Sequence, residues 1–328
     1  KLGVLILLLS LYSSFLIYKI KAPAADDLPR QITIGDEILR GNWDVLYKNT
    51  FSYTEPEYTF YNHHWLSGVV FALLHKVIGW GGLVVFKVLI FLLTFLIFFK
   101  TAAKKTNFWL VALVSIPVIF IIRERTGLRP EVFSYLFIAL YVYILSKFED
   151  NPKSNLVYWL VPLQLLREDM HVFFSIGLML VGGLLFEKVI HNWKKLKESL
   201  VVKKLGILFA LVLLVSLINP RGINGVLYKY PNVSIEISEN QTLIQSDRAG
   251  ELKNDVSIFV FKPVFVLVIV SLLSYFIFRY RRKLSMSPQV YSDDTGYLRD
   301  VPIFYILGMT STMLLSILVI RGMAMFGF

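Results

Sequence analysis

The segment LIFLLTFLIFF, residues 89–99, decides the fold class of this chain. Every residue in it except Thr94 is apolar, so apolar and polar side chains do not alternate. A transmembrane β-strand would show that alternation, because one of its faces meets lipid and the other a polar interior. A helix satisfies its backbone hydrogen bonds internally, as lipid requires. We therefore predict a helical membrane segment here and apply the same reasoning along the chain.

The composition of the whole chain is that of a membrane protein. Of its 328 residues, 56% are hydrophobic and 17% are charged, and the mean hydropathy is +0.62. Soluble domains average about 45–50% apolar and about 25% charged residues. The net charge of +11 comes from short basic clusters between apolar runs, which favours contact with anionic lipid and excludes nucleic acid as the expected partner. The absence of cysteine excludes disulfides, thiolate metal sites and cysteine nucleophiles.

The apolar runs predict an all-α, polytopic helical membrane protein. A bilayer core of about 30 Å needs about 20 mostly apolar residues per helix. We predict about nine spans, near residues 2–20, 81–99, 107–122, 130–147, 154–168, 170–190, 205–219, 257–279 and 301–320. The N-terminal run resembles a cleaved signal peptide, but the many later spans favour an uncleaved first helix. We expect a single transmembrane domain over residues 1–328, truncated at its C-terminus.

The distribution of charge predicts the orientation. Two long polar stretches, 21–64 and 220–256, interrupt the apolar pattern, whereas 188–204 and 279–299 are rich in Lys and Arg. Cytoplasmic loops are enriched in basic residues, so we place the last two inside and the two long loops outside. This requires that WLSGVVFALLHKVIGW, residues 65–80, does not cross the membrane. Tryptophan at both of its ends predicts an interfacial or re-entrant helix on the outer face. The alternative is a short ordinary span, which would invert either the first loop or everything after it.

With this topology, unusual polar residues gather on the outer side. Those that we single out as site candidates are Asp26, Asp27, His63, His64, Trp65, Arg123, Arg125, Arg129, Glu131, Glu168, Asp169 and His171; Arg30, Asn62, Arg167, Asn219 and Arg221 are among the other polar residues on this side. Lys87 and Lys262 lie several residues inside their spans, counted from the outer end, and ionisable groups at such depth usually face a cavity or a partner. A site with acids, guanidinium groups and aromatic rings suits a phosphate-bearing lipid substrate. Arginine binds phosphate in a bidentate fork, and a carboxylate can remove a proton from a hydroxyl.

Each group also has a simpler interpretation. The acidic pair at 26–27 could cap a loop helix, and the histidine pair at 63–64 could be solvated. The arginines could contact lipid headgroups, while Lys87 and Lys262 could extend to the nearest interface. The acidic pair at 168–169 could be a polar hairpin tip. Only their joint occurrence favours a functional site.

The order of these motifs resembles that of the GT-C glycosyltransferases. This fold class includes protein O-mannosyltransferases, aminoarabinose transferases and oligosaccharyltransferases, and the nearest match is to bacterial proteins of the dolichyl-phosphate-mannose-protein mannosyltransferase type. The resemblance extends over the first two thirds of the chain. It rests on ADDLPRQITIGDEILRGNWDVL (25–46), FSYTEPEYTFYNHHWLSGV (51–69), RTGLRPEVFSYLF (125–137), LREDMH (166–171) and INPRG (218–222).

The resemblance implies transfer of a sugar from a polyprenyl-phosphate carrier to a hydroxyl of a glycan, lipid or protein acceptor. By position, the family's essential acid in the first outer loop falls on Asp27 or Asp26, and we favour Asp27. The basic residues that would hold the lipid phosphate are some of Arg123, Arg125, Arg129, Lys87 and Lys262, which the resemblance does not match one by one. We expect inversion at the anomeric carbon, because a single displacement needs no covalent intermediate. A bacterial inner (plasma) membrane location is implied, with the site facing the periplasm or exterior and a role in cell-envelope glycan biosynthesis.

The remaining candidates would contact the substrates. They are Glu131, His63, His64, Trp65, Glu168, Asp169 and His171. Some relatives depend on a divalent metal, and the acids and histidines could supply ligands to Mg²⁺ or Mn²⁺, although their spacing is not diagnostic. The sequence contains no GxGxxG or GxxxxGKS loop, which agrees with a lipid-linked donor rather than a nucleotide sugar.

Two other classes of function fit the same residues. A transporter or flippase of lipid-linked glycans would carry charges near the middle of the membrane, often within inverted repeats. We find no such repeat, and the two lysines inside spans lie toward one side. A non-catalytic scaffold of the same fold would bind lipid-linked glycans or partner subunits without turnover.

Labelling of introduced cysteines tests the predicted topology in this cysteine-free chain. We expect Asp27→Cys, Arg129→Cys and Asp169→Cys to react with a membrane-impermeant maleimide from the same, outer side. Lys195→Cys, in the basic stretch 188–204, should react only after the membrane is permeabilised. Labelling of residues 123–131 or 167–171 from the side opposite to residues 26–27 would contradict a common site.

Overall fold

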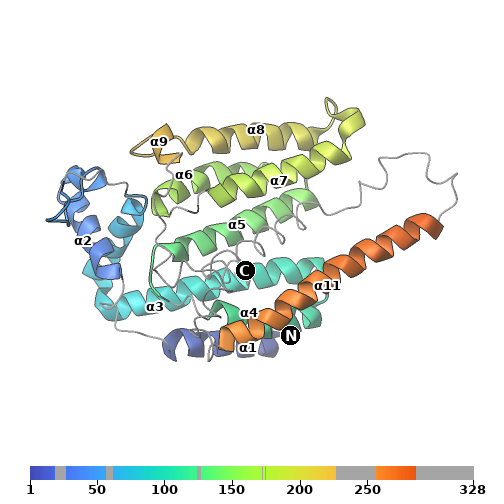
Figure 1. Cartoon of the computed structure of the whole chain (residues 1–328), viewed down its shortest axis with the longest axis horizontal. Helices are drawn as coiled ribbons and strands as arrows, with labels where there is room; N and C mark the ends of the chain where they lie inside the picture. Colours follow the sequence, from blue (N-terminus) through green and yellow to red (C-terminus); the bar gives the residue numbers. More distant parts are fainter. Residues whose placement is uncertain are drawn as a thin grey trace. The chain divides into compact units, whose positions relative to one another are not determined.

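The computed structural model describes residues 1–18, 27–56, 62–123, 127–171, 173, 175–226 and 256–285, with side chains of the last helix described over 259–277. The helices are α1 (Leu2–Tyr18), α2 (Leu28–Leu39), η2 (Trp43–Leu46), α3 (Trp65–Lys105), α4 (Phe108–Ile122), α5 (Glu131–Asp150), η3 (Leu156–Trp159), α6 (Leu160–Met170), α7 (Ser175–His191), η5 (Trp193–Lys195), α8 (Leu200–Val215), α9 (Ile223–Val226) and α11 (Val256–Ser285) (Figure 1). These described residues contain no β-strand, so the predicted all-α class is confirmed for them.

Three of the described helices are long and apolar enough to cross a membrane. They are Trp65–Lys105, Glu131–Asp150 and Phe259–Ile277, and two shorter apolar helices cover Leu2–Ile17 and Phe108–Ile122. Membrane character is therefore supported, while the full set of nine spans stays a prediction. The expected span at 301–320 lies outside the described residues. α6, in the expected span 154–168, has 11 residues and is too short to cross a bilayer core by itself.

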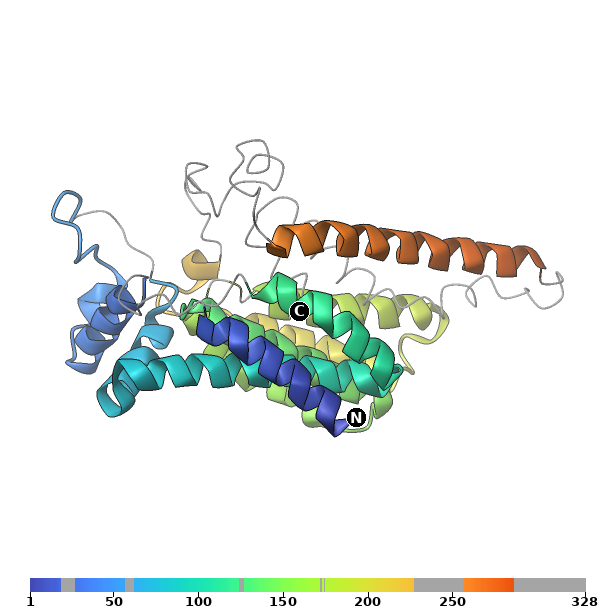
Figure 2. The ribbon, with the colours of Figure 1, turned by 90° about the horizontal axis from the view of Figure 1, so that it is seen from below.

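α3 is interrupted near the predicted boundary at residue 80. Gly79 has φ 60° and ψ −169°, a conformation that glycine adopts readily because it has no Cβ. The chain turns sharply there, so that the part of α3 next to α2 runs at a steep angle to the longer part that follows (Figures 1 and 2). The backbone thus separates residues 65–78 from the apolar helix after them; an interfacial position for the first part remains a prediction.

The chain divides into two compact units. The first comprises Lys1–Ala112, Arg125–Val181 and Gly206–Asn232, and the second comprises Leu113–Glu124, Gly182–Leu205 and Val233–Phe328. In the first unit α1 lies beside α3, where the buried Tyr12 ring contacts Phe91 and Phe95 at centroid distances of 6.4 and 5.7 Å (Figure 2). α3 also packs on α5, where the ring centroids of Phe71 and Phe133 are 5.4 Å apart.

α2 packs against α3 through two glycines. A Cβ on Gly35 would lie 2.1 Å from the carbonyl oxygen of Gly68, and one on Gly68 would lie 2.7 Å from the carbonyl oxygen of Gln31. The backbones therefore approach more closely than any larger residue allows. Beside this contact Ile34, Ile38, Val45 and Leu46 form a buried apolar cluster, against which Trp65 and Val69 pack.

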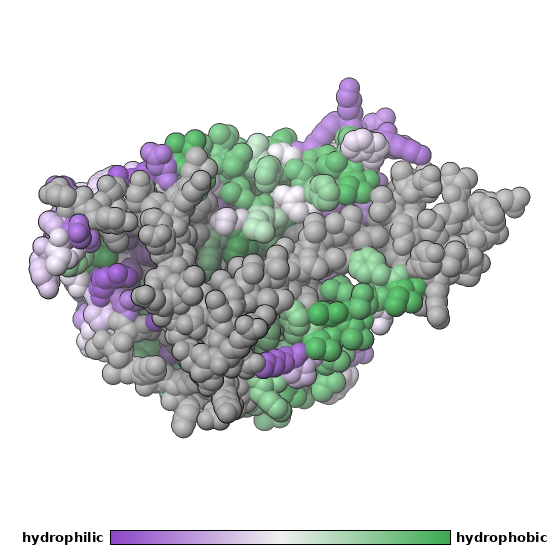
Figure 3. All heavy atoms as spheres, in the orientation of Figure 1, coloured by the Kyte–Doolittle hydropathy of each residue, from purple (hydrophilic) through white to green (hydrophobic). Residues whose placement is uncertain are grey.

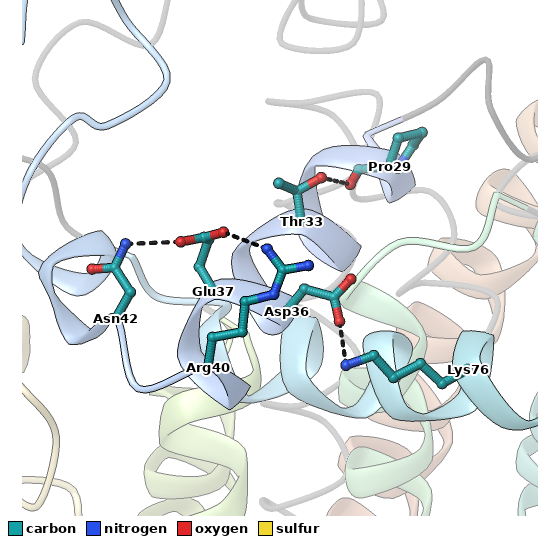
Figure 4. A network of polar contacts seen from close by, with 7 residues as sticks. All are labelled: Pro29, Thr33, Asp36, Glu37, Arg40, Asn42 and Lys76. Atoms are coloured by element: carbon teal, nitrogen blue, oxygen red, sulfur yellow. Dashed lines mark hydrogen bonds and ion pairs between the residues drawn. The ribbon is translucent and has the colours of Figure 1, made fainter.

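The solvent side of α2 carries a polar network. Asp36 pairs with Lys76 of α3 at 2.8 Å, and Glu37 accepts hydrogen bonds from Arg40 at 3.3 Å and from Asn42 at 2.9 Å (Figure 4). Such exposed pairs contribute little to stability, typically about 0.2–1 kcal/mol each. On the visible face hydrophilic residues gather over the end that holds α2, while apolar side chains cover much of the long helices (Figure 3). Leu7, Leu89 and Leu93 are exposed, as expected of surfaces that meet lipid.

Gly35→Ala tests the close contact between α2 and α3. Because the new methyl group would meet backbone atoms, which cannot move aside alone, we expect the free energy of unfolding to fall by about 1–3 kcal/mol. Denaturant unfolding in detergent measures the change. The matched control is Gly81→Ala in α3, where an added Cβ meets nothing within 4 Å; equal losses in the two variants would show that the contact is not tight.

Candidate functional site

Three segments that are distant in the sequence meet at one end of the first unit. They are the start of α3 with the residues before it (62–67), the C-terminal end of α6 (167–171), and the turn between α8 and α9 (219–222). α6 ends at Met170 because His171 has extended backbone, with φ −164° and ψ 146°. The LREDMH segment therefore leaves the helix where the three segments meet.

A buried polar network fixes α6 in place. The Tyr141 hydroxyl of α5 donates to Gln164 Oε1 at 2.7 Å, and Gln164 Nε2 donates to Ser216 Oγ, directly after α8, at 2.9 Å. Buried polar groups without partners are costly, so this chain of bonds specifies how α5, α6 and the end of α8 sit together. Arg167 is fully buried; its guanidinium lies 5.5 Å from the centre of the Tyr141 ring and donates to the carbonyl oxygen of Phe173 at 2.6 Å.

Two hydrogen bonds join the start of α3 to the end of α6. Trp65 Nε1 donates to Asp169 Oδ1 at 2.8 Å, and Ser67 Oγ donates to the carbonyl oxygen of Met170 at 2.6 Å. The Trp65 ring also packs edge-on against Trp43, with centroids 6.3 Å apart. Trp65 thus orients Asp169 of the LREDMH segment and also contacts Trp43 in the polar stretch 21–64.

The histidines form a small stack next to these bonds. The rings of His64 and His171 lie 5.0 Å apart, and His171 Nδ1 is 3.0 Å from Ser134 Oγ of α5. Burial, and then the charges of His63 and Arg30, lower the pKa of His64 to about 3, and burial also lowers the pKa of His63. At neutral pH His64 is therefore an uncharged packing group.

The turn after α8 supplies the third wall. Asn219 Nδ2 donates to the carbonyl oxygens of Ser216 and Gly222 at 3.1 and 3.0 Å, and its Oδ1 accepts from the Arg221 N–H at 2.9 Å. Arg221 Nη2 donates to the carbonyl oxygen of Tyr47 at 3.1 Å, with the guanidinium 4.7 Å from the centre of the Tyr47 ring. These contacts hold the turn after α8 against Tyr47 in the polar stretch 21–64.

These walls line an open cleft. It is lined by Leu46, Asn62, His63, Glu168, Asp169, Asn219, Pro220, Arg221 and Gly225. Glu168 is only 5% exposed, and its buried Oε2 has no hydrogen-bond partner in the described part of the chain. Asn62 is 9% exposed, and its Nδ2 is likewise buried without one. A cleft with buried polar atoms left open is the arrangement expected of a ligand site.

Burial changes the acid chemistry of the LREDMH segment. Burial and the neighbouring Asp169 raise the pKa of Glu168 to about 8, against the opposing effect of Arg167. Burial raises the pKa of Asp169 to about 6, although the hydrogen bond from Trp65 lowers it. At pH 7 Glu168 is mostly protonated and can donate a hydrogen bond. Both groups lie outside the three candidate spans.

Asp27 lies beside two arginines. Its carboxylate is 3.7 Å from Arg30 and 4.0 Å from Arg129, and the side chain is 53% exposed. Asp27 precedes α2 but makes no side-chain capping hydrogen bond, which argues against the simple capping role. The positive charge of Arg30 also contributes to the lowered pKa of His64. Glu131 is buried in the first turn of α5, two residues after Arg129.

Other predicted residues lie elsewhere or outside the described part. Lys87 of α3 is buried, and its Nζ donates a hydrogen bond to the carbonyl oxygen of Leu16 in α1 at 3.4 Å. Lys87 does not line the cleft. Arg123, which lies 5.7 Å from the Phe120 ring, and Lys262 belong to the second unit. Asp26 and Arg125 lie outside the described residues.

The described part of the chain holds no group of three or more His, Asp or Glu side chains arranged to bind a metal ion. The residues placed around the cleft therefore do not form a recognisable Mg²⁺ or Mn²⁺ site, and we derive no step through a metal.

Sequence reasoning did not assign Asn62, Asn219 and Arg221 to the site, although all three line the cleft. The INPRG motif was the available signal, since the predicted topology places this polar turn on the same side as the acids. Comparisons of the chain with models of protein families, with curated proteins and with solved structures find no match.

The pH dependence of stability tests the environment of Glu168. Folded Glu168 keeps its proton up to about pH 8, whereas an unfolded glutamate loses it near pH ~4.3. Unfolding between these values releases a proton, so the free energy of unfolding falls as the pH rises. We expect the thermal midpoint to fall less between pH 5 and pH 8 in Glu168→Gln than in the wild type. Glu55→Gln, at an exposed position, should behave as the wild type; equal falls in all three proteins would contradict a buried, protonated Glu168.

Proposed function

We propose that this protein is a membrane glycosyltransferase that moves a sugar from a polyprenyl-phosphate carrier to an acceptor hydroxyl. The observation that carries the proposal is the grouping of the half-exposed Asp27 with Arg30 and Arg129. Such a transfer needs a base that removes the acceptor proton and positive charge that stabilises the departing phosphate. A carboxylate next to guanidinium groups can supply both. The order of motifs shared with GT-C enzymes supports the substrate class.

In the proposed reaction, Asp27 removes the proton from the acceptor hydroxyl as its oxygen attacks the anomeric carbon. The bond between that carbon and the phosphate oxygen breaks, and the lipid phosphate leaves with the electron pair. Arg129 and Arg30 stabilise the charge that develops on the phosphate. A single displacement from the face opposite the phosphate inverts the anomeric centre. Asp27 keeps the acceptor proton until it exchanges with solvent.

Apolar helices account for the lipid part of the donor. The outward side chains of α1 and α3 include exposed Leu7, Leu89 and Leu93, so the polyprenyl chain can lie along an apolar surface while its phosphate reaches the polar end of the first unit. We propose a bacterial plasma membrane, with the site on the periplasmic or exterior side. The acceptor would be a glycan, lipid or protein hydroxyl of the cell envelope.

Replacing the two acids of the first outer stretch separately tests the base assignment. A general base contributes about 10²–10⁴-fold to the rate. We therefore expect Asp27→Asn to lower the transfer rate by that factor, measured with radiolabelled undecaprenyl-phosphate sugars in proteoliposomes. Asp26→Asn should retain most activity if Asp27 is the base. The matched control is Asp44→Asn, whose exposed carboxylate pairs with Lys48.

Wild-type turnover in both Asp26→Asn and Asp27→Asn would exclude the proposed base. Movement of the labelled lipid across sealed vesicles without a glycosidic product would identify a flippase instead.

A further inference from the structure

We propose that the cleft between the start of α3, the end of α6 and the turn after α8 binds the ring hydroxyls of a sugar, with Asn62 and Glu168 as the two residues that recognise them. The assignment of the hydroxylated ligand as a sugar rests on the proposed function. The recognition of hydroxyl groups rests on the cleft itself, as follows.

The two residues present complementary atoms without partners. Asn62 Oδ1 accepts a hydrogen bond from the His64 N–H at 3.2 Å, which fixes the amide and leaves its Nδ2 as a buried donor. Glu168 Oε2 is a buried carboxyl oxygen that has no hydrogen-bond partner among the residues that the structure describes. Leaving such groups unpaired is unfavourable. A ligand that pairs both would recover that free energy.

A hydroxyl group fits these atoms better than a charged group does. It can accept from Asn62 Nδ2 and, through its own proton or lone pair, can pair with Glu168 in either protonation state. A phosphate would face the carboxyl groups of Glu168 and Asp169, while the guanidinium of Arg221 is already directed at the Tyr47 ring and carbonyl. An ammonium group would lie in the same cleft as Arg221. The raised pKa of Glu168, about 8, adds a donor at neutral pH.

The walls of the cleft are held before any ligand arrives. Trp65 fixes Asp169, and Asn219 is bonded within its own turn by both of its side-chain polar atoms. These bonds fix Asp169 and Asn219, whereas Asn62 Nδ2 and Glu168 Oε2 have almost no accessible surface, so their side chains must turn toward a ligand as it binds.

Saturation-transfer NMR on the protein in phospholipid nanodiscs tests the proposal, because no sugar-based detergent then competes. The probes are methyl α-D-mannopyranoside, methyl β-D-glucopyranoside and methyl α-D-galactopyranoside, with inorganic phosphate as the charged comparison. We expect saturable binding of at least one glycoside in the millimolar range and no competition by phosphate. Glu168→Gln, which keeps a donor and an acceptor, should bind within a few-fold of the wild type.

Two variants remove one recognising atom each. Asn62→Asp keeps the bond to the His64 N–H but replaces the donor by an acceptor, and Glu168→Leu removes both carboxyl oxygens. We expect each to weaken glycoside binding by about tenfold or more. Asn107→Asp is the matched control, because Asn107 is exposed and its Oδ1 likewise accepts from a backbone N–H, that of Trp109, at 2.8 Å. Equal thermal midpoints of the variants show that they fold.

The outcomes separate this inference from the proposed function. No saturable glycoside binding, or binding unchanged in Asn62→Asp and Glu168→Leu, would overturn the sugar site even if transfer occurs. Binding that these variants weaken, without any transfer from lipid donors, would support the sugar site and reject the transferase. Where transfer is observed, a raised KM for a glycoside acceptor in Glu168→Leu assigns the cleft to the acceptor sugar, and a raised KM for the lipid donor assigns it to the donor sugar.

Discussion

The organisation of the first unit depends on one constraint: a polar group surrounded by apolar side chains must find a hydrogen-bond partner within the protein. Gln164 in α6 meets this requirement by bonding both Tyr141 and Ser216, which sets the position of α6. The same constraint pairs Trp65 with Asp169 across 104 positions of sequence. Polar groups that remain open after this pairing, on Asn62 and Glu168, then mark where a ligand can bind.

The helical class could be predicted from the sequence because lipid leaves few alternatives for long apolar runs. The helix boundary near residue 80 was also predictable, since Trp80 and the glycines at 79, 81 and 82 interrupt the apolar pattern. The short α6 was not predicted, because its apolar pattern resembles that of a span. Its polar residues Gln164 and Arg167 are satisfied by neighbouring helices, and a sequence pattern does not show which neighbours a helix will have.

The candidate site could be predicted in outline but not in its contacts. The sequence indicated that the acids, histidines and arginines reach one side, and the structure brings Asp27 to Arg129 and Trp65 to Asp169. It could not indicate that Lys87 turns to a carbonyl of α1, because a long flexible side chain follows the nearest acceptor rather than its position in the helix. The contact of Arg221 with Tyr47 likewise depends on two loops that meet only in the folded chain.

The two acidic positions have different surroundings, and this difference separates their roles. Asp27 is half exposed between arginines, so an acceptor hydroxyl from solvent can reach it and the phosphate that departs can remain near positive charge. Glu168 is buried beside a second carboxyl group, which keeps its proton in place at neutral pH and makes it a hydrogen-bond donor. Environments that push two carboxyl groups toward different protonation states assign different tasks to them. In the proposed reaction we therefore assign proton removal to the exposed acid, and in the proposed sugar site we assign recognition of uncharged hydroxyl groups to the buried one.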